Sequence, residues 1–199
     1  MTTYAGSMSW SARSPDRGYG RAVQRVAING GSGSGKSTLA RRLHDLLDLP
    51  YVEIDSLQHG PGWEPRPTFV DDVATFVDGE RWVIEYQYDA VRPLILERAD
   101  TFVWLDFSTR QVMSQVVRRT VRRRWRREEL WHGNREGPLW RVLVDPGHVV
   151  RAAWRTRDWA AQRAGDSRRS HPELTVVRLR SRTEVEAWLA GLSGGDRPG

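Results

Sequence analysis

The chain has 199 residues, of which 39% are hydrophobic and 28% charged, with a formal net charge of +6 and no cysteine. This length suits one domain with a core large enough to need no disulfide or zinc, and the lack of cysteine excludes thiolate metal sites and cysteine nucleophiles. No apolar run approaches the length of a membrane span, and the first residues show no export pattern. We therefore expect a soluble, cytoplasmic protein whose basic balance favours anionic partners.

The first half of the chain alternates strands with helices. Residues 1–21 carry no periodicity, so we expect a disordered tail there and a domain over 22–192, with a second tail over 193–199. In chain order, hydrophobic periodicity predicts a buried strand over 23–29, a helix over 36–47, a strand over 51–54, a helix that opens at Thr68 and stops at Gly79, a strand over 82–84, a short helix over 90–98 and a strand over 101–105.

The second half continues the alternation. A long helix is predicted from Ser108 to about residue 127, a loop or broken helix over 128–147, a helix over 149–163 and a strand over 174–179. Thr183 and Glu186 have the spacing of a capping box that opens a last helix. Five strands that alternate with helices predict an α/β fold with a parallel, doubly wound sheet.

A phosphate-binding loop separates the first strand from the first helix. The run from Gly30 to Ser37 fits the pattern G-x-x-x-x-G-K-[ST]. Glycines let successive amides converge on phosphate oxygens, and the helix offers its positive end to the same anion. We expect ATP to bind to these residues and to the one that follows them, namely Gly30, Gly31, Ser32, Gly33, Ser34, Gly35, Lys36, Ser37 and Thr38.

Two residues of this loop have specific roles in that chemistry. Lys36 would bridge the β- and γ-phosphates, and the Ser37 hydroxyl would ligate Mg²⁺. Of the 31 basic residues, 30 are arginine and only Lys36 is lysine, and an ammonium is not interchangeable with a guanidinium. The alternative is a flexible Gly/Ser loop that matches by accident, but its place between a strand and a helix favours nucleotide binding.

The chain resembles the adenylate-kinase-related small P-loop kinases, specifically the topology-modulation (FlaR-like) group. The resemblance covers about residues 23–190 and rests on GGSGSGKSTLARRL, Asp55, Gly62-Trp63, WVIEYQY and TFVWLD. It implies a three-layer P-loop fold with five parallel strands in the order 2-3-1-4-5, an acceptor region after the second strand and an arginine-rich lid over about 118–147. The family tends to have Asp-Gly-Asn-Tyr where this chain has Glu85-Tyr86-Gln87-Tyr88. The resemblance therefore implies a reaction type and leaves the acceptor open.

Two carboxylates follow predicted strands, at the edge where α/β proteins bind ligands. By resemblance to small-molecule kinases, Asp55 would orient or deprotonate an acceptor hydroxyl. Glu85 would hold a Mg²⁺-bound water, as the acidic residue after a strand does in P-loop enzymes. The alternatives are a solvated carboxylate at a turn for Asp55 and a structural ion pair with an arginine for Glu85.

Seven arginines lie among residues 118–127, where the family places its lid. Arg118, Arg119, Arg122 and Arg123 have the spacing of one helix face, and lid arginines clamp a transferring phosphate in the resembling kinases. We select Arg118, Arg119 and Arg122 as catalytic candidates; the alternative is a solvated basic face. Trp63 lies in a polar loop beside the expected acceptor site.

The sequence thus predicts a Mg²⁺- and ATP-dependent phosphotransferase that acts on a small hydroxyl- or phosphate-bearing acceptor. A nucleotide-dependent nucleic-acid-binding ATPase is the alternative, because arginine interleaved with tryptophan also binds single-stranded nucleic acid. A third possibility is a nucleotide binder without transfer activity. We expect no membrane partner, and the sequence leaves the oligomeric state open.

Overall fold

The computed structural model describes residues 23–126 and 159–194. Its strands are β1 (Arg25–Gly30), β2 (Trp82–Glu85), β3 (Thr101–Leu105) and β4 (Thr175–Leu179), which form one parallel sheet in the order β2-β1-β3-β4. β1, β2 and β3 read as nearly continuous apolar runs because both faces of the sheet are covered. The fold is therefore α/β with a parallel sheet, as the sequence predicts.

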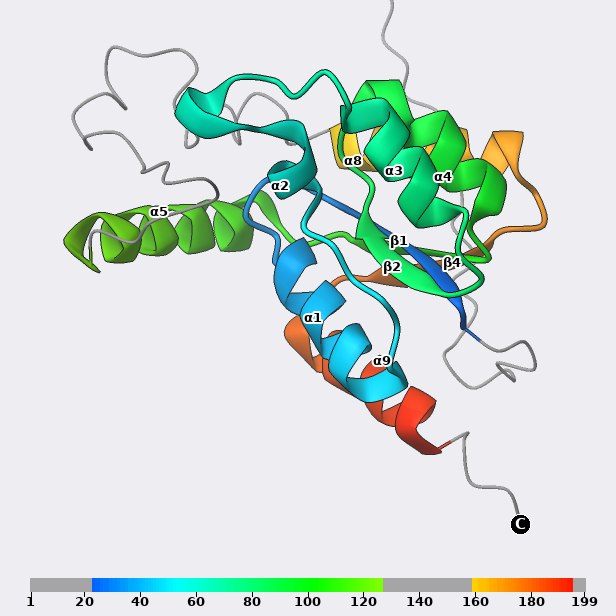
Figure 1. The fold of residues 1–199 in the computed structure, drawn as a ribbon. Helices are drawn as coiled ribbons and strands as arrows, with labels where there is room; N and C mark the ends of the chain where they lie inside the picture. Colours follow the sequence, from blue (N-terminus) through cyan, green and yellow to red (C-terminus); the bar gives the residue numbers. More distant parts are fainter. Residues whose placement is uncertain (1–22, 127–158, 195–199) are drawn as a thin grey trace, which may run out of the picture.

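Helices cover both faces of this sheet and make a three-layer sandwich (Figure 1). One face packs against α1 (Lys36–Leu47) and α9 (Arg182–Gly194), and the other against α3 (Phe69–Val77), α4 (Arg92–Arg98) and α8 (Trp159–Ser170). The short elements α2 (Ile54–Gln58), η1 (Pro61–Trp63) and η2 (Asp89–Val91) connect them. α5 (Thr109–Arg126) follows β3, and its second half extends beyond the body of the domain (Figure 1).

The predicted five-stranded sheet in the order 2-3-1-4-5 is wrong for the described residues, which hold four strands. The segment expected as a strand over 51–54 makes one parallel bridge, between Tyr51 and Val83, and then turns into α2. The physical reason is that Ile54 is fully buried in the core beneath α3, which draws the chain away from the edge of β2. Asp55 therefore lies in the first turn of α2 and not at the end of a strand.

The remaining elements agree with the periodicity, with small shifts at their ends. The helix over 36–47 and the strand over 101–105 are confirmed residue for residue. The last helix is capped two residues earlier than predicted: the Glu184 amide donates to Ser181 Oγ at 3.1 Å, and Glu184 Oε2 accepts from the Arg180 amide at 2.8 Å. Thr183 and Glu186 thus do not form the capping box, and Glu186 pairs with Arg42 of α1 instead.

Some predictions concern residues outside the described ranges. These are the tail over 1–21, the loop over 128–147, most of the helix over 149–163 and the last five residues. α8 begins the described part of that helix at Trp159 and continues to Ser170, and α9 runs to Gly194, two residues past the expected end of the domain. Within residues 23–126 and 159–194, no helix has both the length and the apolar character of a membrane span.

Candidate functional site

The predicted phosphate loop joins the carboxyl end of β1 to the start of α1. Its backbone turns through Gly33 and Gly35, whose φ angles of 79° and 99° lie in the left-handed region that favours glycine. No side chain caps the start of α1. The positive end of α1 therefore adjoins the loop with no capping side chain on it, as a helix-start anion site requires.

The ammonium of Lys36 lies against the loop that it would serve. The side chain is only 8% exposed, and Nζ donates to the carbonyl oxygens of Gly30 at 3.2 Å and Gly31 at 3.3 Å. These contacts hold a buried positive charge within the curve of the loop. A charge at this place complements a polyphosphate.

A buried hydroxyl in the same loop is unsatisfied. Ser34 is 2% exposed, and its Oγ has no hydrogen-bond partner among the described residues. A buried polar atom without a partner is costly, so a ligand that accepted from or donated to this hydroxyl would remove that cost. The loop as a whole therefore fits the phosphates of a nucleotide.

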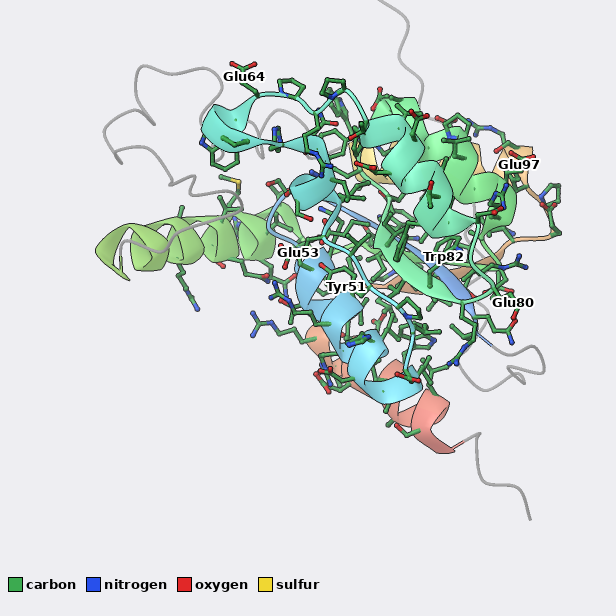
Figure 2. All side chains as sticks on the ribbon, viewed as in Figure 1. Tyr51, Glu53, Glu64, Glu80, Trp82 and Glu97 are labelled. Carbon is green, nitrogen blue, oxygen red and sulfur yellow. The ribbon has the colours of Figure 1, made fainter. Side chains whose placement is uncertain are left out.

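Glu85, which with Ser37 forms the predicted metal pair, is hydrogen-bonded to a tyrosine hydroxyl. Glu85 is 3% exposed at the end of β2, and its Oε1 accepts a hydrogen bond from Tyr51 Oη at 3.3 Å. Burial together with the charge of Glu85 raises the pKa of the Tyr51 phenol above its ordinary value, and the nearby Ser37 hydroxyl acts in the opposite direction. Figure 2 shows Tyr51 and Glu53 between α1 and α2, close to the start of α1.

This arrangement fits Mg²⁺. The described residues contain no group of three or more His, Asp or Glu side chains that would form an all-protein cage. Mg²⁺ in nucleotide sites is held by one or two protein oxygens, with the phosphates and water as its other ligands. A serine hydroxyl and one carboxylate at the phosphate loop are a suitable donor set.

Asp55 is the centre of a second hydrogen-bond network. Its Oδ1 accepts from Gln87 Nε2 at 2.9 Å and from Tyr88 Oη at 2.7 Å, and the Tyr88 oxygen also lies 3.2 Å from His59 Nε2. A carboxylate only accepts, so the Tyr88 hydroxyl donates to Asp55 and is left to accept from His59. Burial and the charge of Asp55 raise the pKa of the Tyr88 phenol. Oδ2 of Asp55 is not used by this network.

An aromatic wall borders this network. Trp63 packs edge-on against His59 with ring centres 5.5 Å apart, and Tyr88 packs edge-on against Phe69 at 5.2 Å. Trp63 is 40% exposed and has a φ of 66°, an unusual backbone conformation for a bulky residue. A loop that keeps an exposed tryptophan in a strained conformation points to a binding role.

A cavity of about 510 Å³ adjoins the phosphate loop at Gly31. It is bounded by the start of α5 and by the ends of β3 and β4, where Arg178 Nε donates to Asp106 at 2.8 Å and the Arg178 guanidinium lies 4.4 Å above the Trp104 ring. This volume is in the range of small-ligand sites.

The part of α5 that contacts the phosphate loop precedes the predicted lid residues. Val116 of α5 is fully buried and lies directly against Gly33. Arg118 is exposed on α5, and no described contact joins it to the loop. Arg119 and Arg122 belong to α5, but their side chains are outside the described part of the structure.

The sequence does not predict the two tyrosines of the site. It indicates Tyr51 only as part of a strand, and Tyr88 only as part of the Glu85-Tyr86-Gln87-Tyr88 motif. Both carry hydroxyls on segments that flank the predicted ligand edge, and that position was the signal available in the sequence. His59 had no signal, because its partner Tyr88 lies 29 residues away in the chain.

Comparison with known proteins supports the fold. No family model and no curated protein sequence matches the chain. Similar solved structures include a shikimate kinase from Acinetobacter baumannii in complex with shikimate (TM-score 0.50, 13% identity, 89% of this chain and 97% of that one). A gluconokinase from Sinorhizobium meliloti has a TM-score of 0.47 at 16% identity, over 88% of this chain and 96% of that one. Both are kinases by name. At 13% identity the likeness to the shikimate kinase shows the fold alone, and we draw nothing further from the gluconokinase, whose TM-score is lower.

Proposed function

We propose that the protein is an ATP-dependent phosphotransferase that moves the γ-phosphoryl group to a hydroxyl of a small acceptor. The single observation that carries this proposal is the buried Lys36 ammonium inside a phosphate loop with an uncapped helix start. Lys36 would neutralise charge on the β- and γ-phosphates. The cavity beside Gly31 would take the nucleoside part of ATP. The adenylate-kinase-related family, and within it the FlaR-like group, is the proposed affiliation.

Mg²⁺ would be held by Ser37 and, through water, by Glu85. When bound, this ion supplies positive charge that offsets the charge of the phosphates. Phosphoryl transfer depends mainly on positioning and electrostatics, so the side chains of the site would position the reactants and neutralise their charge. Arginines of α5 would neutralise the transferring γ-phosphoryl group. The candidates are Arg118, Arg119 and Arg122.

Asp55 would act on the acceptor. Its Oδ1 is held by Gln87 and Tyr88, which leaves Oδ2 to accept the proton of the acceptor hydroxyl. The acceptor oxygen then forms a bond to the γ-phosphorus, the bond between that phosphorus and the β–γ bridging oxygen breaks, and ADP leaves. Trp63 would cover the apolar face of the acceptor, since aromatic rings supply large contact area at low entropic cost.

Two guanidinium groups near this network favour an acceptor with an anionic group. Arg92 donates to the Gln87 carbonyl at 3.1 Å, and Arg163 of α8 lies close enough to Arg92 that burial and this like charge lower the pKa of Arg163. One nearby carboxylate, Asp89, pairs with Arg92. An anion on the acceptor would relieve the repulsion between the two arginines.

The test is ADP production by the full chain with MgATP and a panel of acceptors. The panel pairs anionic and neutral hydroxylated molecules of equal size, and includes shikimate, the molecule bound in one of the similar structures. We expect turnover with an anionic member and little with its neutral counterpart. ATP hydrolysis that depends on added DNA and falls steeply with salt would instead support the nucleic-acid-binding alternative. Binding of ATP without either activity would leave a nucleotide binder.

A further inference from the structure

One hydrogen bond joins Tyr51 to a predicted metal ligand. A carboxylate oxygen accepts, so the Tyr51 hydroxyl donates its only hydrogen to Glu85 Oε1 at 3.3 Å. Glu85 is 3% exposed, and Tyr51 is itself half-buried, so the bond lies away from bulk water.

This bond sets the orientation of the Glu85 carboxylate. Oε1 accepts the hydrogen of Tyr51, and a carboxylate has further lone pairs that remain for another partner. Without the Tyr51 hydroxyl, the carboxylate would lose this fixed partner and could turn about its side-chain bonds.

The position of the tyrosine is fixed by the edge of the sheet. The Val83 amide donates to the Pro50 carbonyl at 2.8 Å, and Tyr51 itself forms the parallel bridge to Val83. Leu49, two residues earlier, is fully buried. The residue that would have belonged to a fifth strand is thus anchored on β2, two residues from Glu85, with its side chain between β2 and α1.

We propose that Tyr51 is a positioning residue, which presets Glu85 for the magnesium of a magnesium–nucleotide complex. This inference rests on the proposed function, because it requires that the phosphate loop binds a nucleotide with its metal. It assigns Tyr51 a role through Glu85 and no contact with the reacting atoms. Outer partners of this kind typically change metal affinity by about 10- to 100-fold when they are removed.

The test is calorimetric titration of the full chain with ATP, once with Mg²⁺ and once with the metal chelated. The quantity of interest is the ATP affinity with Mg²⁺ divided by the ATP affinity without it. A merely structural change at residue 51 would alter both affinities alike and leave this ratio unchanged. Tyr51→Phe should lower this ratio by about tenfold and leave the metal-free affinity unchanged. Tyr86→Phe removes a phenol hydroxyl from a residue that is only 5% exposed and packs on Phe102, and should leave the ratio as it is.

Glu85→Gln completes a double-mutant cycle that works even if Tyr51→Phe is less stable. If Tyr51 acts through Glu85, the two substitutions together should lower the ratio no further than Glu85→Gln alone. An unchanged ratio in Tyr51→Phe, or additive losses in the cycle, overturns the inference while the proposed function stands. A wild-type ratio of one would mean that the metal does not assist nucleotide binding, and the proposed function would then fail together with this inference.

Discussion

Val116 of α5 stands directly over Gly33 of the phosphate loop: a Cβ on Gly33 would lie 2.2 Å from Val116 Cγ2. The first half of the helix that follows β3 therefore packs on the loop, and its second half extends outward with the arginine-rich segment (Figure 1). This contact gives any movement of α5 a direct route to the phosphate site.

Gly33→Ala should destabilise the protein and weaken ATP binding. The positive φ of 79° costs a non-glycine residue about 1–2 kcal/mol, and the overlap with Val116 adds about 1–3 kcal/mol. Denaturant unfolding measures the loss. Val116→Ala removes the methyl group that overlaps the new Cβ. The double variant should therefore lose less free energy of unfolding than the sum of the two single losses. Simple additivity of the two losses would contradict the packing of Val116 on the loop.

Asp55→Asn should abolish most of the turnover and spare nucleotide binding. The amide keeps the shape of the side chain but cannot take a proton, and loss of a general base typically costs about 10²- to 10⁴-fold in kcat. Steady-state kinetics with the best acceptor of the panel, beside ATP calorimetry, separates the two effects. Tyr88→Phe should cost less, since it removes one of two hydrogen bonds that orient Asp55. If the ATP affinity of Asp55→Asn fell by the same factor as its kcat, Asp55 would act on the nucleotide and not on the acceptor.

Trp63→Gly and Trp63→Ala form a matched pair. In most loops alanine is the more stable of the two residues, but at a φ of 66° glycine should be more stable by about 1 kcal/mol. Both substitutions remove the exposed ring, so both should raise the KM for the acceptor by a similar factor, on the order of tenfold. The measurements are denaturant midpoints and acceptor KM. An unaltered KM in both variants would exclude Trp63 from the acceptor site.

The protein should lose stability at alkaline pH through its buried phenols. The pKa values of Tyr51 and Tyr88 are raised in the folded state above the ordinary value of about 10, so the folded state holds these protons more tightly than the unfolded state. The corresponding stability is complete below about pH 10 and is lost as the pH rises above it. Denaturant midpoints against pH, with tyrosinate absorbance as the second signal, test this. Tyr51→Phe should show a shallower decline, and a wild-type curve that is flat above pH 10 would contradict the burial of these hydroxyls.

The elements that depend on residues close together in the chain could be predicted from the sequence. The strand, loop and helix around Lys36 could be predicted because buried β-rich residues, glycines and an amphipathic face follow one another directly. The capping box shifted by two residues because β4 ends at Leu179, which brings Ser181 and not Thr183 to the start of α9.

Contacts between distant segments could not be predicted in this way. The strand expected over 51–54 was lost to a tertiary effect, since burial of Ile54 beneath α3 outweighs its preference for the edge of the sheet. The hydroxyl of Tyr88 meets Asp55 across 33 residues of sequence, and Tyr51 meets Glu85 across 34. No spacing rule encodes such pairs, because the packing of α2 and β2 determines them.

The most direct test of the central claim is calorimetry of the full chain with ATP and Mg²⁺, for the wild type and for Lys36→Ala. We predict magnesium-assisted binding by the wild type and a loss of at least tenfold in affinity on removal of the ammonium, in line with the worth of a charge-assisted contact to phosphate. Wild-type protein that binds no purine triphosphate, or a Lys36→Ala variant that binds it equally well, would contradict the claim that this loop is a nucleotide site.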